Sequence, residues 1–86
     1  MLYEHLLYKI IGQRIKTYRI AKHLTQEQVS EKLQMSRPSV TNIESGKHRI
    51  QIHVLYELAE LFEIPIQDLL VINFDCENEN LKEIVF

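Results

Sequence analysis

Two helix-start signals stand eleven residues apart in the middle of this chain, and a glycine follows the second by ten residues. Thr25 precedes Gln28 at the spacing of a capping box. Ser36 is a second N-cap candidate, and Pro38 fits the first turn of the helix that it would start. Gly46 is a natural residue to end that helix. A tight helix, turn, helix unit of this size is typical of proteins that insert one helix into the DNA major groove.

Apolar residues recur at helical spacing inside both segments. In the first, Val29 and Leu33 are one turn apart, and in the second Val40 and Ile43 share a face. The polar side chains of the second segment are left on or near its outer face: Arg37, Ser39, Thr41 and Asn42. Arg and Asn read guanine and adenine edges in the major groove, so this short helix is predicted to contact bases.

Composition limits the chain to one helix-rich domain. It has 86 residues, of which 45% are apolar, with only two glycines and two prolines. A core of this size gives only marginal stability to a single chain, and small domains often gain stability by forming dimers. The single cysteine, Cys76, cannot form an internal disulfide, which favours a reducing, cytoplasmic location. We expect no membrane association, because no signal peptide or apolar run of transmembrane length is present.

The formal net charge of −2 is unusual for a DNA-binding protein, but the charges are distributed unevenly along the chain. Residues 1–50 carry nine Lys and Arg against four Asp and Glu, whereas residues 51–86 carry one Lys against eight Asp and Glu. This asymmetry indicates a nucleic-acid face on the basic half, with the acidic half turned away from DNA or covering a partner subunit. The alternative is that both halves are ordinary solvated surfaces.

Periodicity predicts an all-α fold with five helices, over about 3–22, 25–33, 36–45, 52–62 and 65–71. Gly12 lies inside the first helix at a cost to its stability, which indicates a close helix contact there. Ile66, Leu69 and Leu70 are predicted to face inward. We expect a compact domain over residues 1–71, with the helix-turn-helix at about 25–45, followed by a C-terminal tail over 72–86 in which residues 71–74 could form a short strand.

The chain resembles the lambda-repressor/Cro-like helix-turn-helix family over roughly residues 11–70. Each motif alone is weak, but together they are specific. The matching pieces are Gly12-x-Arg14-Ile15-Lys16-x-x-Arg19, Leu24-Thr25-Gln26-Glu27-Gln28-Val29, Ser36-Arg37-x-x-Val40-x-x-Ile43-Glu44-x-Gly46, Leu55-x-x-Leu58-Ala59-x-x-Phe62 and Asp68-Leu69-Leu70.

The resemblance implies a five-helix domain whose third helix enters the major groove, and it implies roles for individual residues. A partly buried ion pair between Arg19 and Glu44 would tie the first helix to the third. The residues at base-contacting positions are Arg37, Pro38, Ser39, Thr41 and Asn42. Those at phosphate-contacting positions are Gln26, Ser36, Ser45, Lys47 and Arg49.

Two positions depart from the family pattern. Gln34 stands where glycine is common, so a left-handed backbone there would cost up to about 1 kcal/mol. Pro38 has no backbone N–H, so it can offer a base only apolar contact, for example to a thymine methyl or a sugar. Base reading therefore rests mainly on Arg37 and Asn42.

Each of these residues also has an ordinary structural interpretation. Arg37 could be a solvated charge, although the helix dipole disfavours a cation at a helix start. Asn42 could be an exposed polar spacer, and Gln26 could serve only to cap its helix. The basic loop of Lys47, His48 and Arg49 could likewise have no specific partner.

Catalysis finds little support in the sequence, and we expect no enzyme, metal or cofactor. The four histidines show no metal-ligand spacing with one another or with Cys76: His5, His23, His48 and His53. Cys76 lies in an acidic tract, which blunts a thiol as a nucleophile.

The sequence therefore predicts a transcriptional regulator that binds specific double-stranded DNA as a homodimer. A rival hypothesis is an antitoxin or adaptor, in which the same fold mainly holds a protein partner. The tail is a candidate dimerisation element, and its alternatives are that it folds back on its own helices or is disordered. The predicted dimer interface comprises Ile66, Leu70, Phe74, Leu81, Ile84 and Phe86.

Overall fold

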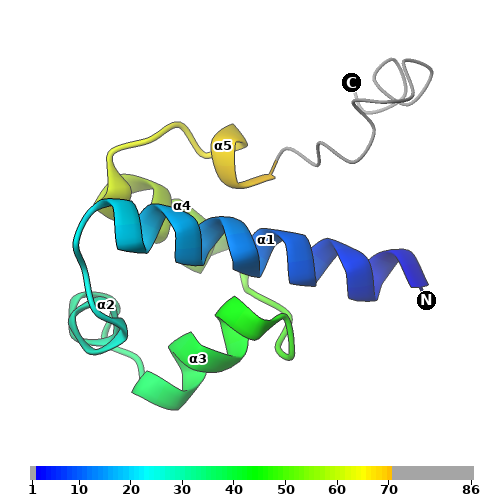
Figure 1. The fold of residues 1–86 in the computed structure, drawn as a ribbon, viewed down its shortest axis with the longest axis horizontal. Coiled ribbons are helices and arrows are strands. Elements are labelled where there is room, and N and C mark those ends of the chain that lie inside the picture. The colour runs from blue at the N-terminus through cyan, green and yellow to red at the C-terminus, as the bar shows by residue number, and fades with distance from the viewer. Residues whose placement is uncertain (1, 71–86) are drawn as a thin grey trace.

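The computed structural model describes residues 2–70, and these residues form five helices and no strand. Helix α1 runs across the middle of the molecule, with α2 and α3 on one side and α5 on the other, and α4 behind (Figure 1). The all-α fold predicted from the sequence is confirmed for this part of the chain. The helices are α1 (Leu2–Ala21), α2 (Gln26–Leu33), α3 (Arg37–Ser45), α4 (Ile52–Phe62) and α5 (Gln67–Leu70).

Both predicted helix starts of the central unit are capped as expected. The Thr25 hydroxyl accepts a hydrogen bond from the Gln28 backbone N–H at 3.0 Å, and the Gln28 side chain accepts one from the Thr25 N–H at 2.8 Å. This reciprocal pair is a capping box. At α3 the Ser36 hydroxyl accepts from the Ser39 N–H at 3.2 Å, and Pro38 lies in the first turn. Local sequence therefore determines where both helices begin.

Helices α2, α3 and α4 all end on a left-handed residue, but only α3 uses a glycine. Gln34 (φ 56°) ends α2 and Glu63 (φ 60°) ends α4, whereas Gly46 (φ 82°) ends α3. At Gly46 a Cβ atom would lie 2.7 Å from the Cα of Lys9 in α1. Residue 46 must therefore be glycine for close packing as well as for its backbone angle.

The core forms where α1 crosses the other helices, and α3 packs most extensively against α1. Gly12 permits this approach, since a Cβ there would lie 2.6 Å from the Glu44 carbonyl oxygen and closer still to that of Ile43. The close contact predicted at Gly12 is thus present. The buried apolar residues are Ile11, Ile15, Val29, Val40, Ile43, Val54, Leu55, Leu58, Ala59, Phe62 and Leu69.

The last helix differs from its prediction. Helix α5 spans only Gln67–Leu70, because Pro65 and Ile66 precede it as a turn whose carbonyls accept from residues 68 to 70. Leu69 is fully buried and Ile66 half-buried, but Leu70 is exposed, so the prediction that Leu70 faces inward was wrong. The predicted strand and tail, with Phe74, Cys76, Leu81, Ile84 and Phe86, lie outside the described residues.

Candidate nucleic-acid interface

An open groove on the surface of α2 and α3 brings together five residues predicted to contact DNA. Helix α3 supplies four of them, and the fifth comes from the first position of α2. Pro38 gives the groove an apolar patch among polar side chains. The groove is lined by Gln26, Arg37, Pro38, Thr41 and Asn42. Residues from two different helices are thereby presented on one surface. A helix that reads bases in the major groove requires such a surface.

The N-terminus of α3 is electropositive. Arg37 is its first residue, and no acidic residue lies in the first turn, whereas α2 has Glu27 in the same place. Within residues 2–70 the ion pairs engage other arginines, and the exposed Arg37 guanidinium has no carboxylate partner. The helix dipole and this free guanidinium both favour an approaching anion.

Ser36 and Ser39 form a pair at the start of α3. Their hydroxyl oxygens lie 2.8 Å apart, and one donates to the other. The pair therefore keeps one hydroxyl proton that is not used between them, and Ser36 is exposed. That proton is available to a phosphate oxygen. Ser39 itself mainly serves the cap of α3, because its N–H donates to Ser36.

The ion pair expected between Arg19 and Glu44 lies beneath the groove. Arg19 Nε is 2.6 Å from Glu44 Oε2, and its Nη2 donates to Oε1 at 3.2 Å, so the pair is bidentate. The side chains are 11% and 3% exposed. Arg19 Nη1 also donates to the Leu24 carbonyl at 2.8 Å, which secures the turn between α1 and α2.

Gln26 links this ion pair to the outer surface of α3, a connection that the sequence analysis missed. Its Nε2 donates to Glu44 Oε1 at 3.0 Å, and its Oε1 accepts from the Thr41 hydroxyl at 2.9 Å. The amide therefore has a fixed orientation, and one Nε2 proton remains for another acceptor. Thr41 can also donate to the Arg37 carbonyl at 3.2 Å, so its single proton is shared.

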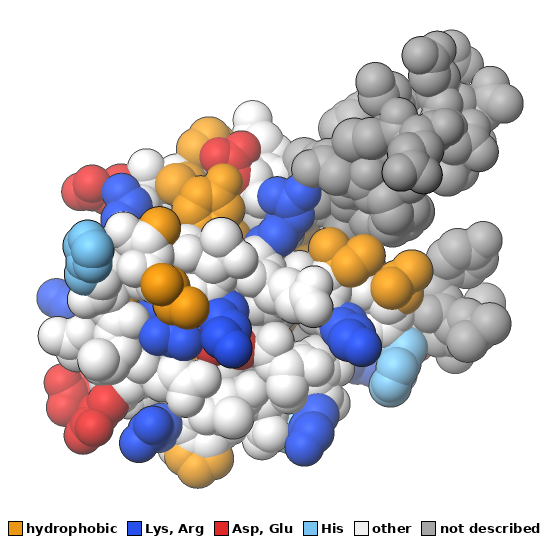
Figure 2. All heavy atoms as spheres, viewed as in Figure 1, with side chains coloured by type: hydrophobic (Ala, Val, Ile, Leu, Met, Phe, Trp, Pro, Cys, Tyr) orange, Lys and Arg blue, Asp and Glu red, His pale blue; other side chains and the backbone are white. Residues whose placement is uncertain are grey.

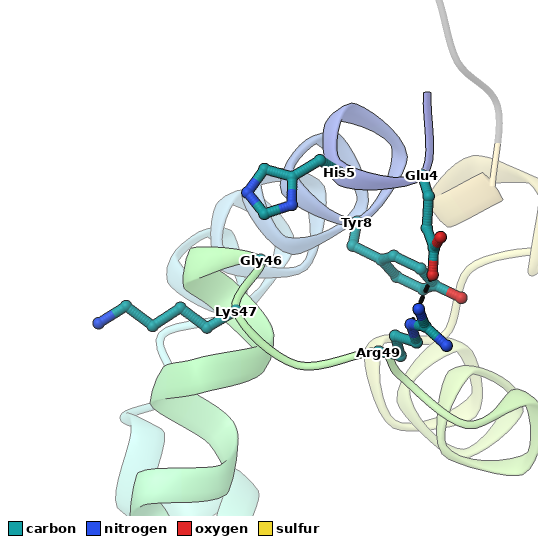
Figure 3. A pocket seen from close by; sticks show the side chains of 6 residues that line it. All are labelled: Glu4, His5, Tyr8, Gly46, Lys47 and Arg49. Carbon is teal, nitrogen blue, oxygen red and sulfur yellow. Dashed lines mark ion pairs between the residues drawn. The ribbon is translucent and has the colours of Figure 1, made fainter. Parts of the chain in front are cut away.

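The predicted phosphate-contacting residues at the C-terminal end of α3 and in the loop after it differ in their surroundings. Ser45 is exposed and donates to the Asn42 carbonyl at 3.1 Å. Lys47 is exposed and extends away from α1, whereas the Arg49 guanidinium turns toward Glu4 and Tyr8 (Figure 3). Arg49 Nε lies 2.5 Å from Glu4 Oε2. No sequence pattern indicated this pair, because its members are far apart in the chain.

Basic side chains are spread widely over one face of the described part of the molecule (Figure 2). Lys and Arg side chains are spread over the face that includes α1, α2 and α3, and most of the Asp and Glu on this face lie toward its edges (Figure 2). Among residues 2–70 there is no cluster of His, Cys, Asp or Glu that could hold a metal ion. None of the described helices is both long and apolar enough to cross a membrane.

Comparison with known proteins agrees with this geometry. A helix-turn-helix family model matches residues 15–69. The chain is 32% identical over 62 residues to an HTH-type transcriptional regulator of Methanocaldococcus jannaschii, covering 72% of this chain and 94% of the relative. It is 31% identical over 64 residues to an HTH-type transcriptional regulator of Archaeoglobus fulgidus, covering 74% and 89%.

Two solved structures share the fold. The restriction-modification controller protein C.AhdI of Aeromonas hydrophila aligns with a TM-score of 0.71 and 26% identity, over 76% of this chain and 94% of that one. The DNA-binding domain of BldD aligns with a TM-score of 0.69 and 28% identity, over 78% and 97%. The chain therefore belongs to the lambda-repressor/Cro-like helix-turn-helix family of DNA-binding transcriptional regulators.

Proposed function

We propose that this protein regulates transcription in the cytoplasm by binding a specific, two-fold symmetric DNA site as a homodimer, with α3 in the major groove. The observation that carries the proposal is the groove that contains both Arg37, at the start of α3 where no acidic residue lies, and Asn42, further along the same helix. Arg37 would read guanine and Asn42 adenine, and the Pro38 ring would contact a thymine methyl. Gln26, Ser36, Ser45 and Lys47 would bind phosphates on either side.

The fixed orientation of Gln26 supports its role at the phosphate backbone. Because Glu44 and Thr41 use one proton and the oxygen of its amide, only the second Nε2 proton is left for DNA. A donor that is already oriented loses little conformational entropy when it binds. The buried ion pair would then act on DNA binding through Gln26 and not by direct contact.

Homodimerisation is part of this proposal. Leu70 at the end of α5 is 37% exposed, while Ile66 already packs against the core. Leu70 would therefore contribute more to an interface than Ile66, together with the predicted tail residues. Two recognition helices would then lie about 34 Å apart, one turn of DNA.

The first experiment is selection of bound sequences from a random double-stranded pool by the wild-type chain. Enrichment of a two-fold symmetric motif is expected. Arg37→Ala and Asn42→Ala should each cost about 1–3 kcal/mol of affinity for that motif and relax preference at one position per half-site. Lys32→Ala is the matched control, because Lys32 lies in a separate groove with residues of α4 and should change specificity little.

Dimerisation is tested separately by sedimentation of the full chain. Leu70→Glu should shift the dimer toward monomer, whereas Ile20→Glu should not, although Ile20 is 55% exposed and also apolar. Absence of any enriched motif, together with Arg37 and Asn42 variants that bind DNA like the wild type, would refute specific reading and favour the protein-interaction hypothesis.

A further inference from the structure

A cavity of about 190 Å³ lies between the first turns of α1 and the loop that follows α3 (Figure 3). Among its lining residues only Glu4 is acidic, whereas Lys47 and Arg49 are cationic. The cavity is lined by Glu4, His5, Tyr8, Gly46, Lys47 and Arg49. A carboxylate in this setting is unexpected for a surface that approaches DNA, because it repels phosphate and neutralises a neighbouring cation.

The Glu4–Arg49 pair is exposed to solvent. The side chains of Glu4 and Arg49 are 36% and 75% exposed, and within residues 2–70 neither makes a side-chain hydrogen bond to any other residue. Exposed pairs of this kind contribute little to stability and exchange readily with other partners. A phosphate oxygen offers Arg49 the same charge-assisted hydrogen bond as the Glu4 carboxylate.

The backbone around the cavity holds the two partners together. Gly46 packs against the backbone of Lys9, which brings the loop after α3 close to α1. Arg49 then turns toward Glu4, while Lys47 extends in another direction (Figure 3). Packing therefore holds the start of this loop close to α1, and a change of partner for Arg49 does not require Gly46 to move.

We propose that Glu4 acts as an internal competitor for Arg49, so that Arg49 contacts the DNA backbone only by exchanging the carboxylate for a phosphate. The inference rests on the DNA binding proposed above, but not on sequence-specific reading. Glu4 thus lowers affinity for all DNA sequences alike and limits the number of phosphate contacts, without a role in the choice of bases.

The test compares Glu4→Gln with the wild type, using a short fluorescein-labelled duplex of mixed sequence and fluorescence anisotropy over a series of salt concentrations. Glu4→Gln removes the charge and keeps the side-chain size. We expect an affinity gain of roughly two- to fivefold at ~0.15 M salt. The slope of log affinity against log salt should steepen by up to about 0.9, the value of one additional phosphate contact.

Glu57→Gln is the matched control, because it makes the same change in net charge on the exposed face of α4. A second comparison uses the Arg49→Ala variant as the starting protein. In this variant, Glu4→Gln should raise the affinity for the duplex no more than Glu57→Gln does. Circular dichroism checks that α1 remains folded, since Glu4 also lies in its first turn.

The inference is overturned if Glu4→Gln binds no tighter than Glu57→Gln, or if its gain persists without Arg49. These outcomes are distinct from failure of the proposed function. A wild-type chain that binds neither the mixed duplex nor any selected motif would refute DNA binding itself. Binding to the mixed duplex without an enriched motif would refute only specific reading.

Discussion

Two Arg–Glu pairs connect α1 to the segment around α3, and they differ mainly in exposure. The side chains of Arg19 and Glu44 are 11% and 3% exposed, whereas those of Arg49 and Glu4 are 75% and 36% exposed. The inner pair is bidentate and shares Glu44 with Gln26, so its geometry is fixed from several sides. The outer pair relies on one contact in water. An Arg–Glu pair therefore stabilises the fold where it is buried, at Arg19 and Glu44. Where it is exposed, at Arg49 and Glu4, the arginine is left free to change partner.

Removing Glu44 should have the largest effect. Glu44→Ala leaves Arg19 with a nearly buried charge and only the Leu24 carbonyl as a partner, and it removes the acceptor of the Gln26 Nε2 group. We expect a loss of about 3 kcal/mol in the free energy of unfolding, measured by urea denaturation. Glu4→Ala, the equivalent change in the outer pair, should cost less than about 1 kcal/mol.

Glu44→Gln provides a milder form of the same test. It replaces the carboxylate with an amide of similar size that keeps one oxygen acceptor, so it should be less destabilising than Glu44→Ala and should remain folded. Equal losses for Glu44→Ala and Glu4→Ala would contradict the distinction between the two pairs.

Gly12→Ala should have the next largest effect on stability. The substitution would push the backbone of α3 at Glu44 away from α1 and so disturb the inner ion pair. The added methyl group would overlap the carbonyl oxygens of Ile43 and Glu44, which cannot rotate away. Overpacking of this kind costs ~1–3 kcal/mol and alanine regains up to ~1 kcal/mol of helix propensity. We expect a net loss of about 1–2 kcal/mol in the free energy of unfolding, again measured by urea denaturation.

The control for this substitution is Gln13→Ala at the adjacent exposed position of α1. It should be neutral or slightly stabilising, since it removes no core contact. A Gly12→Ala variant as stable as Gln13→Ala would mean that α1 and α3 can separate at little cost.

Gln26→Ala should have a smaller effect on stability, because Glu44 keeps both of its bonds to Arg19. Gln26 is only half-buried, so water can replace it as a partner of Glu44 and of Thr41, and the loss of the two hydrogen bonds should cost only about 1 kcal/mol in the free energy of unfolding. DNA affinity should fall as well if the free Nε2 proton contacts a phosphate. Thermal unfolding and anisotropy on the same variant separate the two effects, and an unchanged affinity would leave Gln26 a purely structural residue.

Much of the fold could be predicted because its signals are local. Thr25 with Gln28 and Ser36 with Ser39 lie within one turn of each other, so the sequence shows both caps directly. The short turn before α5 was harder, because a proline at position 65 is compatible with either a helix start or a preceding turn. The structure has the turn, and the short helix after it carries the fully buried Leu69.

The candidate site was only partly predictable for a related reason. The residues on the outer face of α3 follow from helical period, but the partner of Arg49 does not. Glu4 is brought to it by the packing of Gly46 on Lys9, which depends on the whole arrangement of α1 and α3. The links from Gln26 to Glu44 and Thr41 likewise require the crossing of α2 and α3.

The smallest expected effect is the coupling between Glu4 and Arg49 in the free energy of unfolding. A double-mutant cycle of Glu4→Gln and Arg49→Ala should give about 0.2–0.5 kcal/mol at low salt and close to zero at ~1 M salt, because an exposed pair is screened. The buried pair should keep most of its coupling at both concentrations. An outer coupling well above ~1 kcal/mol that survives high salt would mean that Arg49 is fixed in place as Arg19 is. Arg49 could not then exchange the Glu4 carboxylate for a phosphate. The two pairs would differ only in where they lie in the fold and not in the strength of their coupling.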